Sequence, residues 1–255
     1  MVRYFLKLAY KGTAYHGWQI QENASTVQEE LNHKIGVMTG DEVNLVGCGR
    51  TDTGVHAREF YAHFDLTVPL HFLEEDFVAK LNSFLSKDIV ILGLCQVPKD
   101  YHARFSATQR TYKYYISRRK NPFERDFCLE YTGPLDLEAM QEAAGYLQKY
   151  TDFTSFSKLH TQTKTNDCVI KEAYWEVQGD KLIFTISADR FLRNMVRAVV
   201  GTLMEVGKGK MKPREVEDII NAKDRSRAGY SVPAKGLFLE KVEYPFSLED
   251  AMAKQ

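Results

Sequence analysis

Gly49-Arg50-Thr51-Asp52-Thr53-Gly54-Val55-His56-Ala57 is a tight polar stretch between two strand-like runs, residues 43–48 and 59–65. It predicts a strand–loop–strand unit that holds one carboxylate in the loop. Arg50 stands two residues before Asp52, and a cationic neighbour favours the ionised form of a carboxylate. An ionised carboxylate suits a nucleophile or an electrostatic stabiliser. The alternative is a surface hairpin in which Asp52 only caps its own turn.

The sequence around this loop predicts alternating strands and helices. The helix expected at 26–39 has Thr26 and Glu29 at the spacing of a capping box, and Gly40 follows its last residue. The elements expected in the first half are a strand at 2–9, the helix at 26–39, strands at 43–48 and 59–66, a helix at 71–85 and a strand at 89–97. This order is β-α-β-β-α-β.

The second half repeats the same order. Asp136 is the expected cap of its first helix, and Gly179-Asp180 is a strong turn signal between two strands. The expected elements are a strand at 108–118, a helix at 136–148, strands at 168–178 and 181–188, helices at 190–206 and 213–222, and a strand at 236–244. We therefore predict an α+β fold of two ferredoxin-like halves with antiparallel sheets, residues 1–98 and 99–255.

Bulk composition excludes several classes of protein. Of the 255 residues, 44% are hydrophobic and 27% are charged, which is ordinary for a globular protein. No run of about 18 apolar residues occurs, so no membrane span is expected, and the start of the chain lacks a signal-peptide hydrophobic block. The four cysteines are scattered without a Cys-x-x-Cys pair, so we expect reduced thiols in the cytoplasm and no structural zinc.

Basic residues gather in two segments although the net charge is zero. Residues 99–125 hold eight basic and two acidic side chains, and residues 190–214 hold seven basic side chains and one acidic. Such segments can form a local anion-binding face. An ordinary solvated surface is the alternative.

The helix expected at 190–206 places three arginines on one side, away from its apolar stripe. Arg190, Arg193 and Arg197 follow one another at spacings of three and four residues, and Gly201 continues that side and leaves room for something to approach. An arginine row can clamp phosphates or pair with a buried carboxylate. An amphipathic helix with solvated arginines explains the periodicity equally well.

Aromatic residues stand among cations in the strand expected at 108–118. Alternation puts Tyr112 and Tyr114 on one face, where an aromatic ring beside cations can stack on a nucleobase; core packing is the alternative. Trp18 is expected to be a packing residue.

The histidines lack metal-ligand spacing, and Gly-rich phosphate loops are missing. Asp52-Thr53-Gly54 matches the core of aspartic-protease motifs, but the chain has one copy where those enzymes need two carboxylates.

Five blocks together resemble the TruA family of tRNA pseudouridine synthases. The Gly49–Ala57 block is the most specific, and the shared order of the blocks covers nearly the whole chain. The other four are Tyr15–Gln19, Ala103 to Tyr112, Asp152–Phe156 and Phe191 to Gly207. The chain departs from residues usual in the family at Lys11, Thr53, Lys164 and Val232.

The resemblance implies an isomerase that converts uridine to pseudouridine at positions 38, 39 and 40 of the tRNA anticodon stem-loop. It implies a homodimer without a cofactor or metal, and an active-site cleft between the two halves. Asp52 would be the nucleophile, attached at C1′ or C6 of the substrate, or its charge would trap a sugar cation; these alternatives stay open. Arg50 would help to extrude or replace the target base, Tyr112 would stack on uracil, and Arg197 would pair with Asp52. Arg190 and Arg193 would bind the RNA.

A non-catalytic RNA-binding protein on a ferredoxin-like scaffold is the alternative from another class. It would need basic and aromatic surfaces but no reactive carboxylate. The presence of Asp52 together with Arg50, Tyr112 and Arg197 favours the enzyme.

Overall fold

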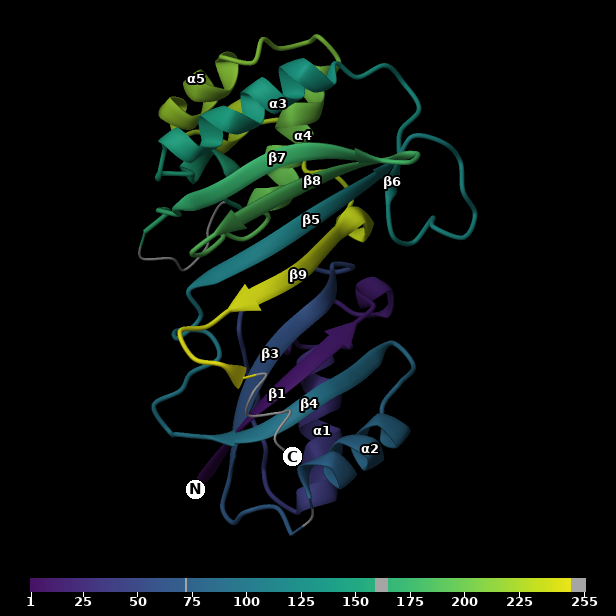
Figure 1. The fold of residues 1–255 in the computed structure, drawn as a ribbon, viewed down its shortest axis with the longest axis vertical. Helices are drawn as coiled ribbons and strands as arrows, with labels where there is room; N and C mark the ends of the chain where they lie inside the picture. The colour runs from purple at the N-terminus through teal and green to yellow at the C-terminus, as the bar shows by residue number, and fades with distance from the viewer. Residues whose placement is uncertain (72, 159–164, 249–255) are drawn as a thin grey trace. The chain divides into compact units, whose positions relative to one another are not determined.

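The computed structural model describes residues 1–71, 73–158 and 165–248, so Lys164 lies outside the described residues. The chain divides into two compact units, drawn in Figure 1. The first comprises Met1–Thr108 and Leu239–Gln255, and the second comprises Gln109–Phe238. Both contain α-helices and strands whose pairing is largely antiparallel.

The first unit is built around a central strand, β1 (Val2–Tyr10). This strand pairs antiparallel with β3 (His56–Leu66) on one side and with β4 (Ile89–Val97) on the other. The two-residue strand β2 (Val46–Gly47) pairs with the far side of β3. Successive residues of a strand point to opposite faces, and neighbours such as Phe5 and Leu6 are both fully buried. Both faces of this sheet are therefore covered along β1.

Helices α1 (Val27–Thr39) and α2 (Glu74–Phe84) bury Leu31, Ile35, Phe77 and Leu81 in this unit. The start of α1 confirms the predicted cap, because the Thr26 side chain accepts the Glu29 N–H at 3.3 Å. Gly40 ends α1 in the left-handed conformation with φ of 76°. Helix α2 begins at Glu74, later than the 71 predicted, and residue 72 lies outside the described residues.

The strand predicted at 43–48 is reduced to β2 because side chains of α1 hold the backbone before it. The N–H of Leu45 donates to Asn32 Oδ1 at 2.9 Å, and its carbonyl accepts from Gln28 Nε2 at 2.6 Å. Both backbone groups of Leu45 are thus bonded to helix side chains and not to a neighbouring strand.

The first unit runs on to Thr108, beyond the boundary predicted at 98. Arg3 donates to the carbonyls of Lys99 and Tyr101 at 2.6 and 3.0 Å. Near the other end of the segment, the Thr108 N–H donates to the carbonyl of Glu243 at 2.8 Å. These contacts tie residues 99–108 to the first unit and to the segment at Glu243, a long-range association that local sequence pattern does not reveal.

In the second unit β5 (Gln109–Ser117) and β7 (Ile170–Gln178) lie on either side of β8 (Lys181–Ala188), all antiparallel. Gly179 makes the β7–β8 turn with φ of 60°, which confirms the predicted hairpin. The short strand β6 (Leu129–Glu130) pairs parallel with β5. The last strand, β9 (Leu237–Glu243), begins in the second unit and ends in the first.

Three helices of the second unit, α3 (Leu137–Tyr146), α4 (Met195–Gly207) and α5 (Glu215–Ala222), lie together beside β7 and β8 (Figure 1). Asp136 caps α3 as predicted, accepting the Ala139 N–H at 3.0 Å. Helix α4 is apolar on most sides and its residues are nearly all buried. Short 3-10 helices occur at Gly12–Ala14, Leu147–Lys149, Thr154–Phe156, Arg225–Arg227 and Ala234–Gly236.

Candidate active site

The Asp52 loop joins β2 to β3 as a tight turn, as predicted. The Val55 N–H donates to the Asp52 carbonyl at 3.1 Å, and Gly54 has φ of 78°, a conformation that favours glycine. On the β2 side, the Cys48 N–H donates to the carbonyl of Tyr61 at 2.7 Å. Asp52 itself is half-buried and Arg50 is exposed.

A second segment, residues 12–18, fixes the backbone of this loop. The Trp18 N–H donates to the Thr51 carbonyl, and the Gly54 N–H donates to the Tyr15 carbonyl, both at 3.3 Å. The Gly12 N–H donates to His56 Nδ1 at 3.0 Å. The two sequence blocks at 15–19 and 49–57 are therefore hydrogen-bonded to each other, and these bonds fix the backbone at Asp52.

Two glycines make this close approach possible. A Cβ on Gly17 would lie 2.3 Å from the Thr51 carbonyl oxygen, and a Cβ on Gly12 would lie 2.0 Å from that of Val55. Gly17 also has φ of 90°. Any other residue at position 17 would push the loop away and carry backbone strain as well.

Trp18 supports the same loop from the core, which confirms its prediction as a packing residue. Its side chain is 1% exposed, and its ring stacks on Phe60 with centroids 4.2 Å apart. A hydrogen bond of 2.9 Å also joins the hydroxyl of Thr51, in the loop, to the hydroxyl of Tyr10. The carboxylate is thus carried on a loop anchored to buried aromatic residues.

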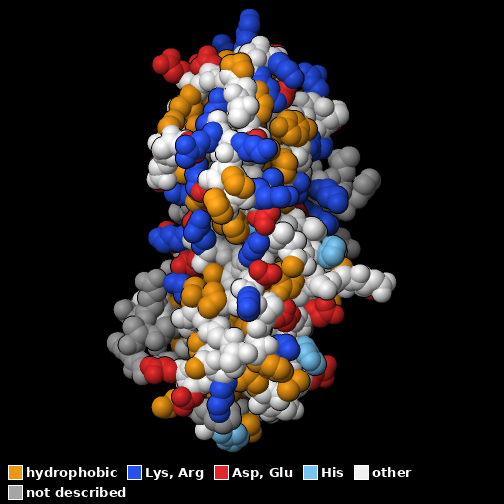
Figure 2. Space-filling model, turned by 90° about the vertical axis from the view of Figure 1, so that its right-hand side faces the viewer, with side chains coloured by type: hydrophobic (Ala, Val, Ile, Leu, Met, Phe, Trp, Pro, Cys, Tyr) orange, Lys and Arg blue, Asp and Glu red, His pale blue; other side chains and the backbone are white. Residues whose placement is uncertain are grey.

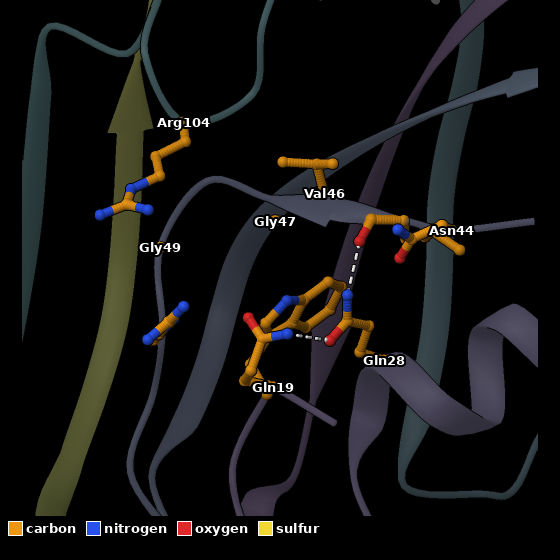
Figure 3. A pocket seen from close by; sticks show the side chains of 10 residues that line it. Gln19, Gln28, Asn44, Val46, Gly47, Gly49 and Arg104 are labelled. Carbon is orange, nitrogen blue, oxygen red and sulfur yellow. Dashed lines mark hydrogen bonds between the residues drawn. The ribbon is translucent and has the colours of Figure 1, made fainter. Parts of the chain in front are cut away.

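A pocket opens beside the loop in the first unit, and Figure 3 shows it from close by. The buried side chain of Gln28 organises one wall. Its Oε1 accepts from Gln19 Nε2 and from the Ile20 N–H, both at 2.9 Å, and its Nε2 donates to Leu45. The lining residues are Trp18, Gln19, Gln28, Asn44, Leu45, Val46, Gly47, Gly49, Arg50 and Arg104.

Arg104 lies in a turn whose backbone N–H groups are hydrogen-bonded to two histidines. His63 Nδ1 accepts the Ala103 N–H at 3.1 Å, and His102 Nδ1 accepts the N–H groups of Arg104 and Phe105 at 3.1 and 3.2 Å. Burial lowers the pKa of His63 to about 4, and burial also lowers the pKa of His102. Both rings therefore stay neutral at pH 7, with Nδ1 as the acceptor.

In the second unit, Tyr112 lies on β5 opposite Ile186 and contacts Phe191 edge to face, with ring centroids 5.1 Å apart. Tyr112 is half-buried. Tyr114 is fully buried, donates its hydroxyl proton to the Pro233 carbonyl at 2.8 Å, and has its pKa raised by burial. The two tyrosines thus differ in exposure, and Tyr114 belongs to the core.

The prediction of an arginine row on one helix is wrong, because α4 begins at Met195. The carboxylate of Asp189 accepts the Arg190 N–H at 2.7 Å, and Asn194 adopts a left-handed conformation with φ of 67°. Arg190 and Arg193 therefore lie in the loop before the helix. Arg190 donates to Thr165 Oγ1 at 3.4 Å, and Arg193 is exposed.

Arg197 lies in the first turn of α4 and is half-buried. Its Nε donates to the Val232 carbonyl at 2.8 Å, and the Val232 N–H donates back to the Arg197 carbonyl at 3.2 Å. The space predicted beside Gly201 is filled, since a Cβ there would lie 1.8 Å from the Tyr230 carbonyl oxygen. Residues 230–232 therefore cover this side of α4 and hold the Arg197 guanidinium in place.

The structure joins Arg50 and the Asp52 loop to the 12–18 segment in the first unit. It places Tyr112, Arg190, Arg193 and Arg197 in the second. Arg104 and Gln28 were missed as pocket residues, although Arg104 stands within the block at 103–112.

Within residues 1–71, 73–158 and 165–248, no three His, Cys, Asp or Glu side chains gather in a way that could hold a metal ion. In those same residues, none of the helices has the length and apolar character needed to cross a bilayer.

Comparison with known proteins agrees with the motif resemblance. A family model described as tRNA pseudouridine synthase matches residues 143–245. The chain is 50% identical over 256 residues to the tRNA pseudouridine synthase A of Parabacteroides distasonis, covering 98% of this chain and 100% of that relative. The chain belongs to the tRNA pseudouridine synthase A family. It is therefore an isomerase, as the motifs predicted.

Other members of the tRNA pseudouridine synthase A family align just as completely. The relative in Porphyromonas gingivalis is 50% identical over 250 residues, covering 97% of this chain and 99% of the relative. The relative in Clostridium acetobutylicum is 44% identical over 241 residues, covering 94% and 98%. Both units of this chain are therefore covered by the alignments with family members.

Proposed function

We propose that the chain isomerises uridine to pseudouridine at positions 38, 39 and 40 of the tRNA anticodon stem-loop. Membership of the tRNA pseudouridine synthase A family supports the reaction. The observation that carries the proposal is the half-buried carboxylate of Asp52 on a loop whose backbone is fixed from both sides. A carboxylate carried on a fixed backbone has fewer positions to search before it meets a substrate atom.

The reaction rearranges one nucleotide. The N1–C1′ glycosidic bond breaks, the uracil turns, and a C5–C1′ bond forms. C5 then loses its proton and N1 gains one, so no atom is added and no electron is exchanged with another molecule. What the protein must supply is a nucleophile, a way to expose the base, and a group that removes the C5 proton.

Asp52 is the proposed nucleophile, at C1′ or at C6. A base within a stem must first leave its stack, which costs a few kcal/mol. Arg50, exposed on the loop, would help to extrude the target base or take its place. Tyr112 would stack on the uracil, with its ring oriented by Phe191, and is the first candidate for the base that removes the C5 proton.

Arginines of the second unit complete the proposed site. Arg197, held by the Val232 carbonyl, would pair with Asp52 and keep it charged. Arg190 and Arg193 would bind RNA phosphates from the loop before α4. On this proposal, residues of both units act on one uridine in an active-site cleft.

The strand order β4-β1-β3-β2, together with β5-β8-β7, supports two ferredoxin-like halves. We further propose a homodimer in which basic surfaces of both subunits hold one tRNA by shape. A cytoplasmic location follows from the substrate.

The test is to incubate the purified protein with unmodified tRNA that carries uridines at 38–40 and to map pseudouridine by chemical labelling. Asp52→Ala should abolish the product, while Asp76→Ala, which removes an exposed carboxylate at the start of α2, should leave it unchanged. If the parent protein binds the tRNA without modifying it, the chain is an RNA-binding module and the catalytic roles are wrong. If Asp52→Ala retains activity, another nucleophile acts.

A further inference from the structure

We propose that Arg104 binds a backbone phosphate of the RNA and forms, with Arg50, a phosphate subsite beside the Asp52 loop. This inference rests on the proposed function, because it names a contact to the same substrate. Both arginines line one pocket of the first unit, although 54 positions separate them in sequence. Figure 3 shows the Arg104 side chain extending from its turn toward the chain at Gly49, the residue that precedes Arg50 in the sequence.

The chemistry of the pocket suits an anion. Among its ten described lining residues, two are arginines and none is a carboxylate. Guanidinium groups match phosphate oxygens in a planar, two-pronged geometry. Two like charges in one pocket also repel each other, so an anion bound between them gains attraction from both and relieves that repulsion.

The backbone that carries Arg104 is ordered in advance. Ala103 is fully buried, its N–H is bonded to His63, and its carbonyl accepts the Tyr244 hydroxyl at 2.7 Å. His102 then accepts both following N–H groups. Because the turn is fixed before the RNA arrives, only the exposed side chain of Arg104 has to be ordered on binding.

The next residue supports the guanidinium from one side. The Phe105 ring is 76% exposed, and the Arg104 guanidinium carbon lies 5.5 Å from its centroid. The ring itself contacts His102, with centroids 4.4 Å apart. An aromatic ring contacts the flat face of a guanidinium, whereas the donors that bind an anion lie along its edge.

The opposite wall is equally well fixed. Gln28 is 5% exposed, and its amide links α1 to the Gln19 side chain, the Ile20 N–H and the Leu45 carbonyl. Gln19 and Asn44 present further amide groups to the pocket. Amides next to an arginine pair are suited to a sugar–phosphate backbone, where hydroxyl and phosphate oxygens alternate.

The experiment measures RNA binding without turnover. Asp52→Ala protein is titrated with the unmodified tRNA at several salt concentrations, and Arg104→Gln is added to that background. We expect Kd to rise about tenfold, the low end for a lost charge-assisted hydrogen bond. The slope of log Kd against log salt should fall by about 0.7–0.9, the value for one phosphate contact.

Two further variants separate charge from structure. Arg104→Lys keeps the positive charge, so it should retain the salt slope of the parent. Lys80→Gln removes a charge from an exposed position of α2 that does not line the pocket, so it should change neither quantity. Unchanged Kd and slope in Arg104→Gln overturn the proposal. Equal losses in both Arg104 variants without a change of slope also overturn it, because charge is then not the cause.

Activity distinguishes this inference from the proposed function. With Asp52 intact, Arg104→Gln should raise KM and leave the rate at saturating tRNA unchanged. A lower saturating rate with unchanged Kd contradicts a binding role. If the parent chain makes no pseudouridine but Arg104→Gln still loses affinity and slope, the proposed function fails while the phosphate subsite stands.

Discussion

Lowering the pH from 7 to 5 should lower the free energy of unfolding of the first unit through the titration of His63. This ring is 3% exposed, and burial, followed by the charges of Arg3 and His102, lowers its pKa from 6.5 to about 4, with Asp65 opposing. Between these two values the unfolded chain binds a proton that the folded chain excludes. The stability contributed by neutral His63 is therefore complete above pH 6.5 and is lost as the pH falls toward 4.

The size of the loss follows from the two pKa values. Linkage gives about 2 kcal/mol lost at pH 5 and about 3 kcal/mol at pH 4. The structure adds a local consequence, since Nδ1 of a protonated ring can no longer accept the Ala103 N–H. Acid should therefore loosen the turn that carries Arg104 before it unfolds the unit.

The assay uses the position of the two tryptophans, Trp18 in the first unit and Trp175 in the second. In a Trp175→Phe background, urea unfolding followed by fluorescence reports on the core around Trp18. His63→Gln keeps an acceptor but does not titrate, so its stability should change about 2 kcal/mol less than the parent's between pH 7 and 5. His33→Gln, at an exposed position of α1, should behave as the parent does. Equal losses in the parent and in His63→Gln would refute the reasoning.

Two glycine substitutions test the packing that the structure shows. Gly17→Ala should lower the single-turnover rate at least tenfold, because its Cβ would displace the Thr51 carbonyl next to Asp52; Gly40→Ala, which also has positive φ but open space around its Cβ, should keep the rate. A normal rate for Gly17→Ala would show that the loop backbone does not matter. Gly201→Ala should destabilise the second unit in urea unfolding followed at Trp175, whereas Gly145→Ala, in open space on α3, should stabilise it by about 0.5–1 kcal/mol; stabilisation by both would contradict the close contact with Tyr230.

Local signals in the sequence predicted most elements correctly. The Thr26 and Asp136 caps and the Gly179 turn all form as expected, because each depends on residues within a few positions of one another. Errors occurred where a side chain takes a backbone group that a strand or helix would use, or where the backbone turns left-handed. Asn32 and Gln28 hold Leu45 away from strand pairing, and at the start of α4 the Asp189 side chain and the left-handed Asn194 delay the helix.

In the candidate site too, residues in a local motif were predicted, and residues whose role depends on distant contacts were missed. The Gly49–Ala57 block was sufficient to propose Asp52 and Arg50 as site residues, since the block is local and specific. The role of the Tyr15–Gln19 block could not be predicted from the sequence, because Gly17 matters through a contact with a loop more than 30 residues further along the chain. Arg104 was missed for the same reason: its place beside Arg50 depends on His63 and His102, which fix its turn only after the sheet has formed.

The sequence by itself determined the order of strands and helices, the family, and the loop that carries the carboxylate. These depend on periodicity, on caps and turns, and on short specific motifs, all of which act over a few residues. Only the tertiary structure decided which segments fix that loop, which arginines lie in the loop before α4, and which basic side chain shares a pocket with Arg50. Such choices are made by hydrogen bonds and close packing between residues far apart in the chain, and the free energy of those contacts exists only once the chain is folded.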